Sequence, residues 1–103
     1  MRFCRVATED EAKYICECIV RGELSDCSLS AKVTVYEALL KTDEEKYRSF
    51  ILEDIRKNYS VMLDLGSDTV WETLRGCDDF SGAGSLCHGW SSVPIYFYHR
   101  LLL

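Results

Sequence analysis

Apolar residues recur at helical spacing near the start of the chain, with charged and polar residues between them. The apolar positions of this stretch are Ala12, Ile15, Cys16, Ile19 and Val20. Thr8 followed by Glu11 is a capping-box pattern, and the acidic residues at positions 9 to 11 suit the positive end of a helix dipole. The pattern predicts an amphipathic helix that begins after Thr8 and ends at Gly22.

Two further helices are predicted, one over residues 28–41 and one from a cap at Thr42 or Asp43 to Gly66. The earlier helix is apolar around most of its circumference, so we expect it to be an inner helix covered on more than one side. The β-branched run at residues 33–35 leaves a strand as an alternative there. The later helix carries a single apolar stripe: Tyr47, Phe50, Ile51, Ile55, Tyr59, Met62 and Leu63.

Residues 66–92 predict a long loop, with a short extended piece at residues 69–74. A loop of this length inside a compact domain is usually functional or disordered, and its aromatic residues argue against disorder. Pro94 suits the first turn of a last helix over residues 93–103, with Ser91 or Ser92 as its cap. That helix is apolar nearly all round, so we expect the chain to self-associate through it or to be a truncated protein. The fold class is all-α, with helical hairpins in a single unit of residues 1–103.

Composition and charge exclude several classes of function. The chain has 17 acidic and 12 basic residues, and the basic ones form no cluster, so nucleic acid is not an expected partner. Residues 1–7 lack the apolar run of a signal peptide, and no apolar stretch approaches the roughly 18 residues that span a bilayer. We therefore expect a cytoplasmic protein that does not enter membranes.

Six cysteines raise the question of disulfides or a metal site. Cys16 and Cys18 lie on nearly opposite sides of the first helix, and there is no C-x-x-C pair. Cys87 and His88 lack a second pair at ligand spacing, so the sequence predicts no metal and no other cofactor. The cysteines, Cys4 included, are expected to be reduced thiols that behave as small apolar residues.

Candidate chemistry is confined to two short segments that together hold both tryptophans and one of the two histidines. They are Thr69-Val70-Trp71-Glu72-Thr73-Leu74 and Gly84-Ser85-Leu86-Cys87-His88-Gly89-Trp90-Ser91. An indole beside a carboxylate is an arrangement that glycosidases use, since the ring stacks on a sugar and lowers the local dielectric around the acid. The alternatives are a core tryptophan beside a solvated Glu72, and a loop histidine whose ring bonds to backbone.

These two segments, with the intervening Asp78-Asp79-Phe80-Ser81-Gly82-Ala83, resemble the C-terminal end of the catalytic domain of bacterial α-L-rhamnosidases. Residues 28–40 and 62–66 also resemble helices of that family, so the likeness covers roughly residues 7–101. It implies a part of a six-hairpin α/α toroid, comprising about its last two hairpins. The chain departs from the family at Leu74, where a second tryptophan is common.

By this resemblance Glu72 matches the general base of an inverting glycoside hydrolase, and Trp71, His88 and Trp90 match residues that line the rhamnose pocket. The partner is then a carbohydrate, an L-rhamnose-containing glycoside. The family's general acid lies upstream of the part that this sequence resembles, so the isolated chain is expected to be inactive. The alternative function is a small helical interaction or dimerisation module derived from such an enzyme.

Overall fold

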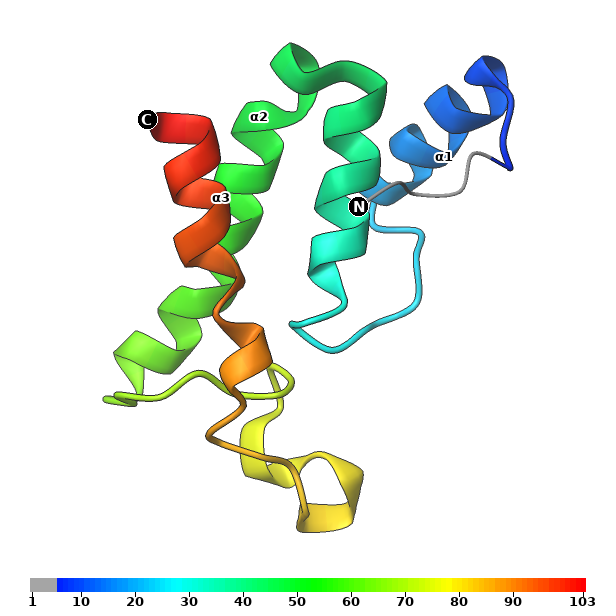
Figure 1. Cartoon of the computed structure of the whole chain (residues 1–103). Helices are drawn as coiled ribbons and strands as arrows, with labels where there is room; N and C mark the ends of the chain where they lie inside the picture. The colour runs from blue at the N-terminus through cyan, green and yellow to red at the C-terminus, as the bar shows by residue number, and fades with distance from the viewer. Residues whose placement is uncertain (1–5) are drawn as a thin grey trace.

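The computed structural model describes residues 6–103, and within them the chain is helical, with no strand (Figure 1). Three α-helices, α1 (Glu9–Val20), α2 (Lys32–Asp64) and α3 (Val93–Leu102), are joined by loops. Three single-turn 3₁₀ helices, η1 (Gly76–Asp78), η2 (Phe80–Gly82) and η3 (Gly89–Ser91), lie in the long loop before α3. The predicted all-α class is confirmed.

The capping box that the sequence predicts at the start of α1 is present. Glu11 N–H donates to Thr8 Oγ1 at 3.2 Å, and Thr8 N–H donates to the Glu11 carboxylate at 2.7 Å. These bonds satisfy two backbone N–H groups that a helix start otherwise leaves unpaired. They also hold the Glu11 carboxylate in its charged form, which lowers its pKa.

Helix α2 folds back on itself at Asp43, where the backbone leaves helical geometry with φ −160° and ψ 96°. Asp43 Oδ1 accepts from Lys46 N–H at 3.1 Å and so caps the second arm, as the sequence predicts. Thr42 instead donates to Ala38 O within the first arm. Figure 1 shows the two arms as an antiparallel hairpin, so the two predicted helices exist and meet directly at the bend.

The first arm of α2 begins at Lys32, four residues later than the sequence predicts. Residues 28–31 form turns, and Leu29 N–H donates to Glu72 O at 2.9 Å across to the long loop. Backbone bonds of these residues run over three residues, as from Ala31 N–H to Ser28 O at 3.1 Å, so the chain enters α2 through tighter turns, and the tertiary bond holds their start to the long loop. The alternative of a strand at residues 33–35 is wrong, because these residues lie within the helix.

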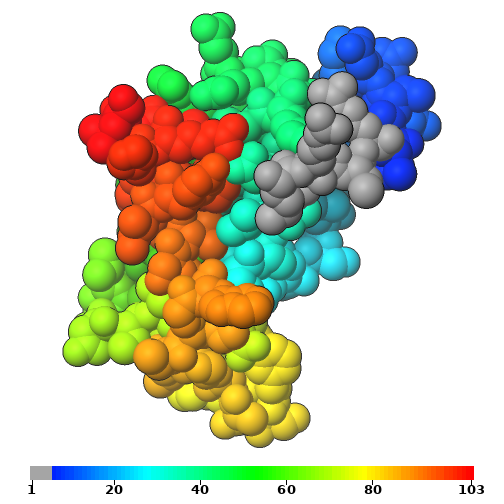
Figure 2. Space-filling view, in the orientation of Figure 1, coloured from blue at the N-terminus to red at the C-terminus, as the bar shows by residue number. Residues whose placement is uncertain are grey.

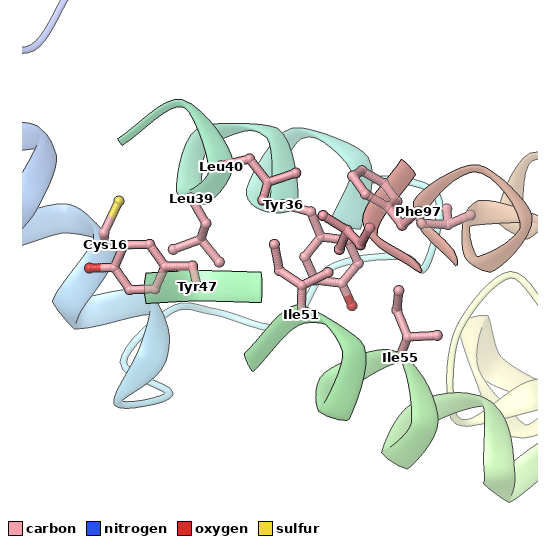
Figure 3. Close-up of a cluster of buried hydrophobic side chains, with 10 residues drawn as sticks. Cys16, Tyr36, Leu39, Leu40, Tyr47, Ile51, Ile55 and Phe97 are labelled. Atoms are coloured by element: carbon pink, nitrogen blue, oxygen red, sulfur yellow. The ribbon is translucent and has the colours of Figure 1, made fainter. Parts of the chain in front are cut away.

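The main core lies between the two arms of α2, α1 and α3 (Figure 3). Its buried members are Cys16, Tyr36, Leu39, Leu40, Tyr47, Ile51, Ile55, Val93, Phe97 and Leu101. The first arm of α2 contacts α1 through the Cys16 thiol, 3.3 Å from Thr42 Oγ1, and contacts α3 through an edge-on pair of the Tyr36 and Phe97 rings. This confirms the predicted inner position of the earlier helix.

A second, smaller core of Leu29, Met62 and Trp71 lies where the long loop crosses the end of α2. Tyr59 packs against both cores, and its hydroxyl donates to Ser91 O at 2.5 Å. Burial raises the pKa of Tyr59 to about 12, so the phenol keeps its proton and its hydrogen bond at neutral pH. Tyr59 thereby fixes the start of α3 to the second arm of α2.

Helix α3 starts with Pro94 in its first turn, as predicted, but neither Ser91 nor Ser92 caps it through its side chain. Val93, Phe97 and Leu101, spaced four apart, form its buried face. Arg100, near the other end, pairs with the buried Glu37 of α2. α3 is therefore held to α2 by one apolar face and one ion pair.

Candidate functional site

The two segments that carry the candidate chemistry lie side by side, joined by backbone hydrogen bonds. Glu72 N–H donates to Ser85 O at 2.9 Å, and His88 N–H donates to Val70 O at 2.8 Å. The Thr69 hydroxyl adds a bond to Leu86 O. The predicted extended piece therefore pairs with residues 85–88, although neither segment is regular enough to count as a strand.

Trp71 lies inside the second core, where only 8% of its surface is exposed. Its indole N–H donates to Ser67 Oγ at 3.1 Å, which satisfies the one polar atom of the ring. Leu29 and Met62 pack around it. In this chain Trp71 anchors the loop to α2, and its predicted stacking on a sugar stays a prediction.

Glu72 and His88 lie on the paired segments, and both residues are half-buried. Within residues 6–103 the Glu72 carboxylate makes no hydrogen bond or ion pair, and neither does the His88 ring. The alternative of a histidine ring bonded to backbone is therefore wrong. The backbone N–H of His88, and not its ring, makes the hydrogen bond to Val70 O. Both side chains retain their full capacity to bind a water molecule or a ligand.

Trp90, in η3, is 84% exposed and lies apart from the buried Trp71. It borders a hollow of about 440 Å³ with Val33 and Glu37 of α2 and with Val93 and Tyr96 of α3. In Figure 2 the orange segment that contains η3 meets the red α3 above it and the cyan start of α2 beside it. Neither Trp71, Glu72 nor His88 lines this hollow, so the four predicted residues do not share one pocket.

The turn after the first segment is held by the Asp79 carboxylate. It accepts from Thr73 Oγ1 at 2.7 Å and from Phe80 N–H at 2.9 Å, and Arg75 lies 3.7 Å away. These bonds, that from Thr73 foremost, lower the pKa of Asp79. The same turn places Phe80 and Ser81 at positive φ, a conformation that side chains rarely adopt and that the Asp79 bonds help to maintain.

Sequence reasoning missed a polar group between the arms of α2. The Tyr36 hydroxyl donates to Asp54, which also accepts from Lys32 Nζ at 3.1 Å, and Asn58 lies one turn further along the second arm. Burial, followed by the bond to Asp54, raises the pKa of Tyr36. A signal was present, because Asn58 falls among Ile51, Ile55 and Met62 at the spacing of the buried stripe.

The described residues were compared with the patterns of metal sites, disulfides and membrane spans. Residues 6–103 contain no group of three or more His, Cys, Asp or Glu side chains arranged to hold a metal ion. Cys16, Cys18, Cys27, Cys77 and Cys87 are free thiols, and Cys4 lies outside the described residues. Of the helices within residues 6–103, none has both the length and the apolar character needed to cross a bilayer.

No protein-family model, curated protein or solved structure matches the chain. The case for a function therefore depends on the motifs and on the geometry just described.

Proposed function

We propose that the chain forms one wall of the sugar pocket of a glycoside hydrolase that resembles inverting α-L-rhamnosidases. Glu72 is the general base in this proposal. His88, on the same paired segments, and Trp90, on a separate part of the wall, contribute to binding the rhamnose ring. The helical hairpin of α2 is then part of an α/α toroid. Trp71 supports this wall from beneath, through its packing on Leu29 and Met62.

The observation that carries the proposal is the pairing of the two motif segments around an unengaged carboxylate. Backbone bonds at 2.8 and 2.9 Å hold residues 70–72 against residues 85–88. The Glu72 carboxylate, half-buried on this pair, has all of its acceptor positions available. An inverting base must accept a proton from water rather than hold a structural partner, so an unengaged carboxylate on a fixed backbone suits the role.

The geometry also supports a carbohydrate as the ligand at Trp90. An indole with 84% of its surface exposed is free to stack on the C–H face of a sugar. Glu37 borders the same hollow. Its Oε1 accepts from Arg100 and Tyr96, and its Oε2, which makes no hydrogen bond within residues 6–103, can accept from a sugar hydroxyl. We expect weak binding, because one open wall leaves much of the sugar in water.

Tryptophan fluorescence separates the two indoles. In the Trp71→Phe variant, where Trp90 is the remaining indole, we expect L-rhamnose to change the emission saturably and D-mannose to change it much less. Trp90→Phe is the matched control, since the buried Trp71 is expected not to respond. A Trp71→Phe protein that gives no saturable change, or the same change with both sugars, would contradict the proposal.

The unmodified chain is expected not to hydrolyse an aryl α-L-rhamnoside. A general acid commonly supplies about 10² to 10⁴ in rate, and no residue of this chain is assigned that role. Hydrolysis by the purified chain that Glu72→Gln abolishes would overturn the expectation of inactivity while supporting Glu72 as the base. Hydrolysis that survives Glu72→Gln would count against Glu72 itself.

A second candidate function, a module that pairs with another copy of itself, is favoured by the outward side of α3. Ile95, Tyr98 and Leu102, spaced three and four apart, lie away from the buried face, and Ile95 is 75% exposed. Leu103 extends this apolar surface at the end of the chain. Two such faces packed together would remove each from water.

Light scattering across a concentration series tests this pairing. We expect the unmodified chain to gain mass with concentration, and the Leu102→Glu variant to remain a monomer, because a charge at the centre of an apolar interface is costly to bury. Leu63→Glu is the matched control, because Leu63 is also exposed but belongs to the second arm of α2. Equal masses for all three proteins would exclude pairing through α3.

A further inference from the structure

A second hollow, of about 630 Å³, opens between the arms of α2 and the turn at residues 73–80. It lies at the end of the hairpin where the two long connections of the chain, before α2 and before α3, come together (Figure 1). Its walls come from Lys32 and Tyr36 on one arm, Asp54 and Asn58 on the other, and Thr73 and Phe80 from the turn. A hollow of this volume is within the range that small-molecule sites occupy.

Asn58 is a nearly buried residue of this hollow whose side chain has no hydrogen-bond partner in the described part of the chain. Only 8% of its surface is exposed, yet its side-chain amide makes no hydrogen bond within residues 6–103. The amide atoms of Asn58 are not fully covered, because within residues 6–103 Ser91 Oγ is the one fully covered side-chain oxygen or nitrogen without a partner. Since Asn58 lines the hollow, its amide retains some access to it. A nearly buried amide needs one or more partners, and here only water or a ligand that enters the hollow can supply them.

The charges that line the hollow balance. Lys32, Lys57 and Arg75 face Asp26, Asp54 and Asp79, three cations against three anions, and two of these sets are ion pairs. Lys32 bonds to Asp54 at 3.1 Å, and Arg75 lies 3.7 Å from Asp79. Opposite charges that neutralise each other leave little net attraction for an ion or a zwitterion. The unsatisfied group is a neutral amide with both donors and an acceptor, and its complement is a neutral hydroxyl, which is likewise donor and acceptor.

The lining of the hollow also includes apolar surface. Phe80 is exposed, and Phe50 and the buried Leu29 line other parts of the wall. A ligand that fits must therefore present both hydroxyl groups and apolar C–H surface. Sugars have this two-sided character, and their C–H faces pack against aromatic rings.

We propose that this hollow is a binding site for a neutral sugar unit, with the Asn58 amide as the group that reads its hydroxyls. The site is separate from Glu72 and Trp90, neither of which lines it. It therefore does not depend on the hydrolase proposal.

The composition of the chain provides a direct reporter for this site. Asn58 is the only asparagine, and the chain has no glutamine, so a two-dimensional ¹⁵N–¹H spectrum contains one side-chain amide pair. The indole N–H signals of Trp71 and Trp90 appear in the same spectrum. One titration of the unmodified protein therefore observes this hollow and the hollow of about 440 Å³ that Trp90 borders (the Trp90 hollow) independently.

We expect L-rhamnose or D-glucose, titrated to about 100 mM because weak sugar sites have millimolar affinity, to shift the Asn58 amide pair saturably. Asn58→Leu, similar in size but unable to hydrogen-bond, is expected to lower the affinity about tenfold, followed through the backbone N–H signals of Leu29 and Thr73. Arg56→Ala is the matched control: Arg56 lies on the same arm, pairs with Glu53 at the surface and does not line the hollow.

Several results would overturn the site. They are an Asn58 pair that does not shift saturably with either sugar, a shift that only the zwitterion L-alanine produces, or equal affinity in the Asn58→Leu protein. A shift of the Trp90 indole signal without the Asn58 pair would refute this site and support the hydrolase proposal. A shift of the Asn58 pair without the Trp90 signal would do the reverse.

Discussion

Replacing Phe97 by alanine is expected to lower the free energy of unfolding by about 3 to 5 kcal/mol, the usual range for removing a buried phenylalanine. Phe97 has no exposed surface and lies at the centre of the buried face of α3. Its ring stands edge-on to Tyr36 at 5.2 Å and to Tyr96 at 4.9 Å between centroids. The substitution therefore removes apolar contact and two favourable ring pairs at once.

Urea denaturation followed by circular dichroism measures this loss. Ile95→Ala is the matched control, because Ile95 lies two residues away on the same helix with 75% of its surface exposed, and we expect it to change stability by no more than about 0.5 kcal/mol. Equal effects of the two substitutions would mean that α3 does not pack on α2 through Phe97. The Trp90 hollow, which α3 and α2 both border, would then lose its basis.

The helices were predictable because the signals that start and end them are local. Thr8 and Glu11 meet within one turn, and Asp43 caps the arm that follows it directly in sequence. The apolar stripe of the second arm likewise repeats at fixed spacing. The start of α2 was placed too early because residues 28–31 form tighter turns, whose start is held by a bond from Leu29 to Glu72, more than forty residues away.

The environments of the two tryptophans were not predictable from the sequence. Both stand in the long loop before α3, yet Trp71 is buried and Trp90 is exposed. The difference arises from the crossing of the loop over the end of α2, where Leu29 and Met62 form a place for one ring. Such a crossing is a tertiary feature, and periodicity carries no information about it.

The candidate site was predictable as a pair of segments but not as a pocket. The concentration of candidate residues in residues 69–74 and 84–91, and the resemblance of both to one family, favoured a common site, and backbone bonds join the two segments. Which side chains face a common hollow depends on the direction of each residue in an irregular loop. For Asn58 the opposite holds. Its position in the buried stripe could be predicted from spacing, but the polar residues that surround it in the hollow could not.

Substituting Gly84 by alanine is expected to disrupt the loop that carries Glu72, at a cost of about 3 kcal/mol, near the upper end for overpacking. A Cβ atom at Gly84 would lie 1.9 Å from the carbonyl oxygen of Gly76, which is backbone and has no rotamer to change. Gly76 has little room to retreat, because it packs against the Trp71 ring and has a φ of +58°. The strain therefore passes from Gly84 through Gly76 to the buried indole.

Gly89→Ala provides the matched control for this prediction. A Cβ atom at Gly89 would meet no other atom within 4 Å, so a change of no more than about 0.5 kcal/mol is expected. Urea denaturation gives the two free energies, and the fluorescence of Trp71, followed in a Trp90→Phe background, should shift to longer wavelength in Gly84→Ala alone. If both glycines tolerate alanine equally, residues 76 and 84 are not in contact. The turn between the motif segments would then not fix residues 70–72 against residues 85–88, and Glu72 would lose the rigid backbone that its role as a base requires.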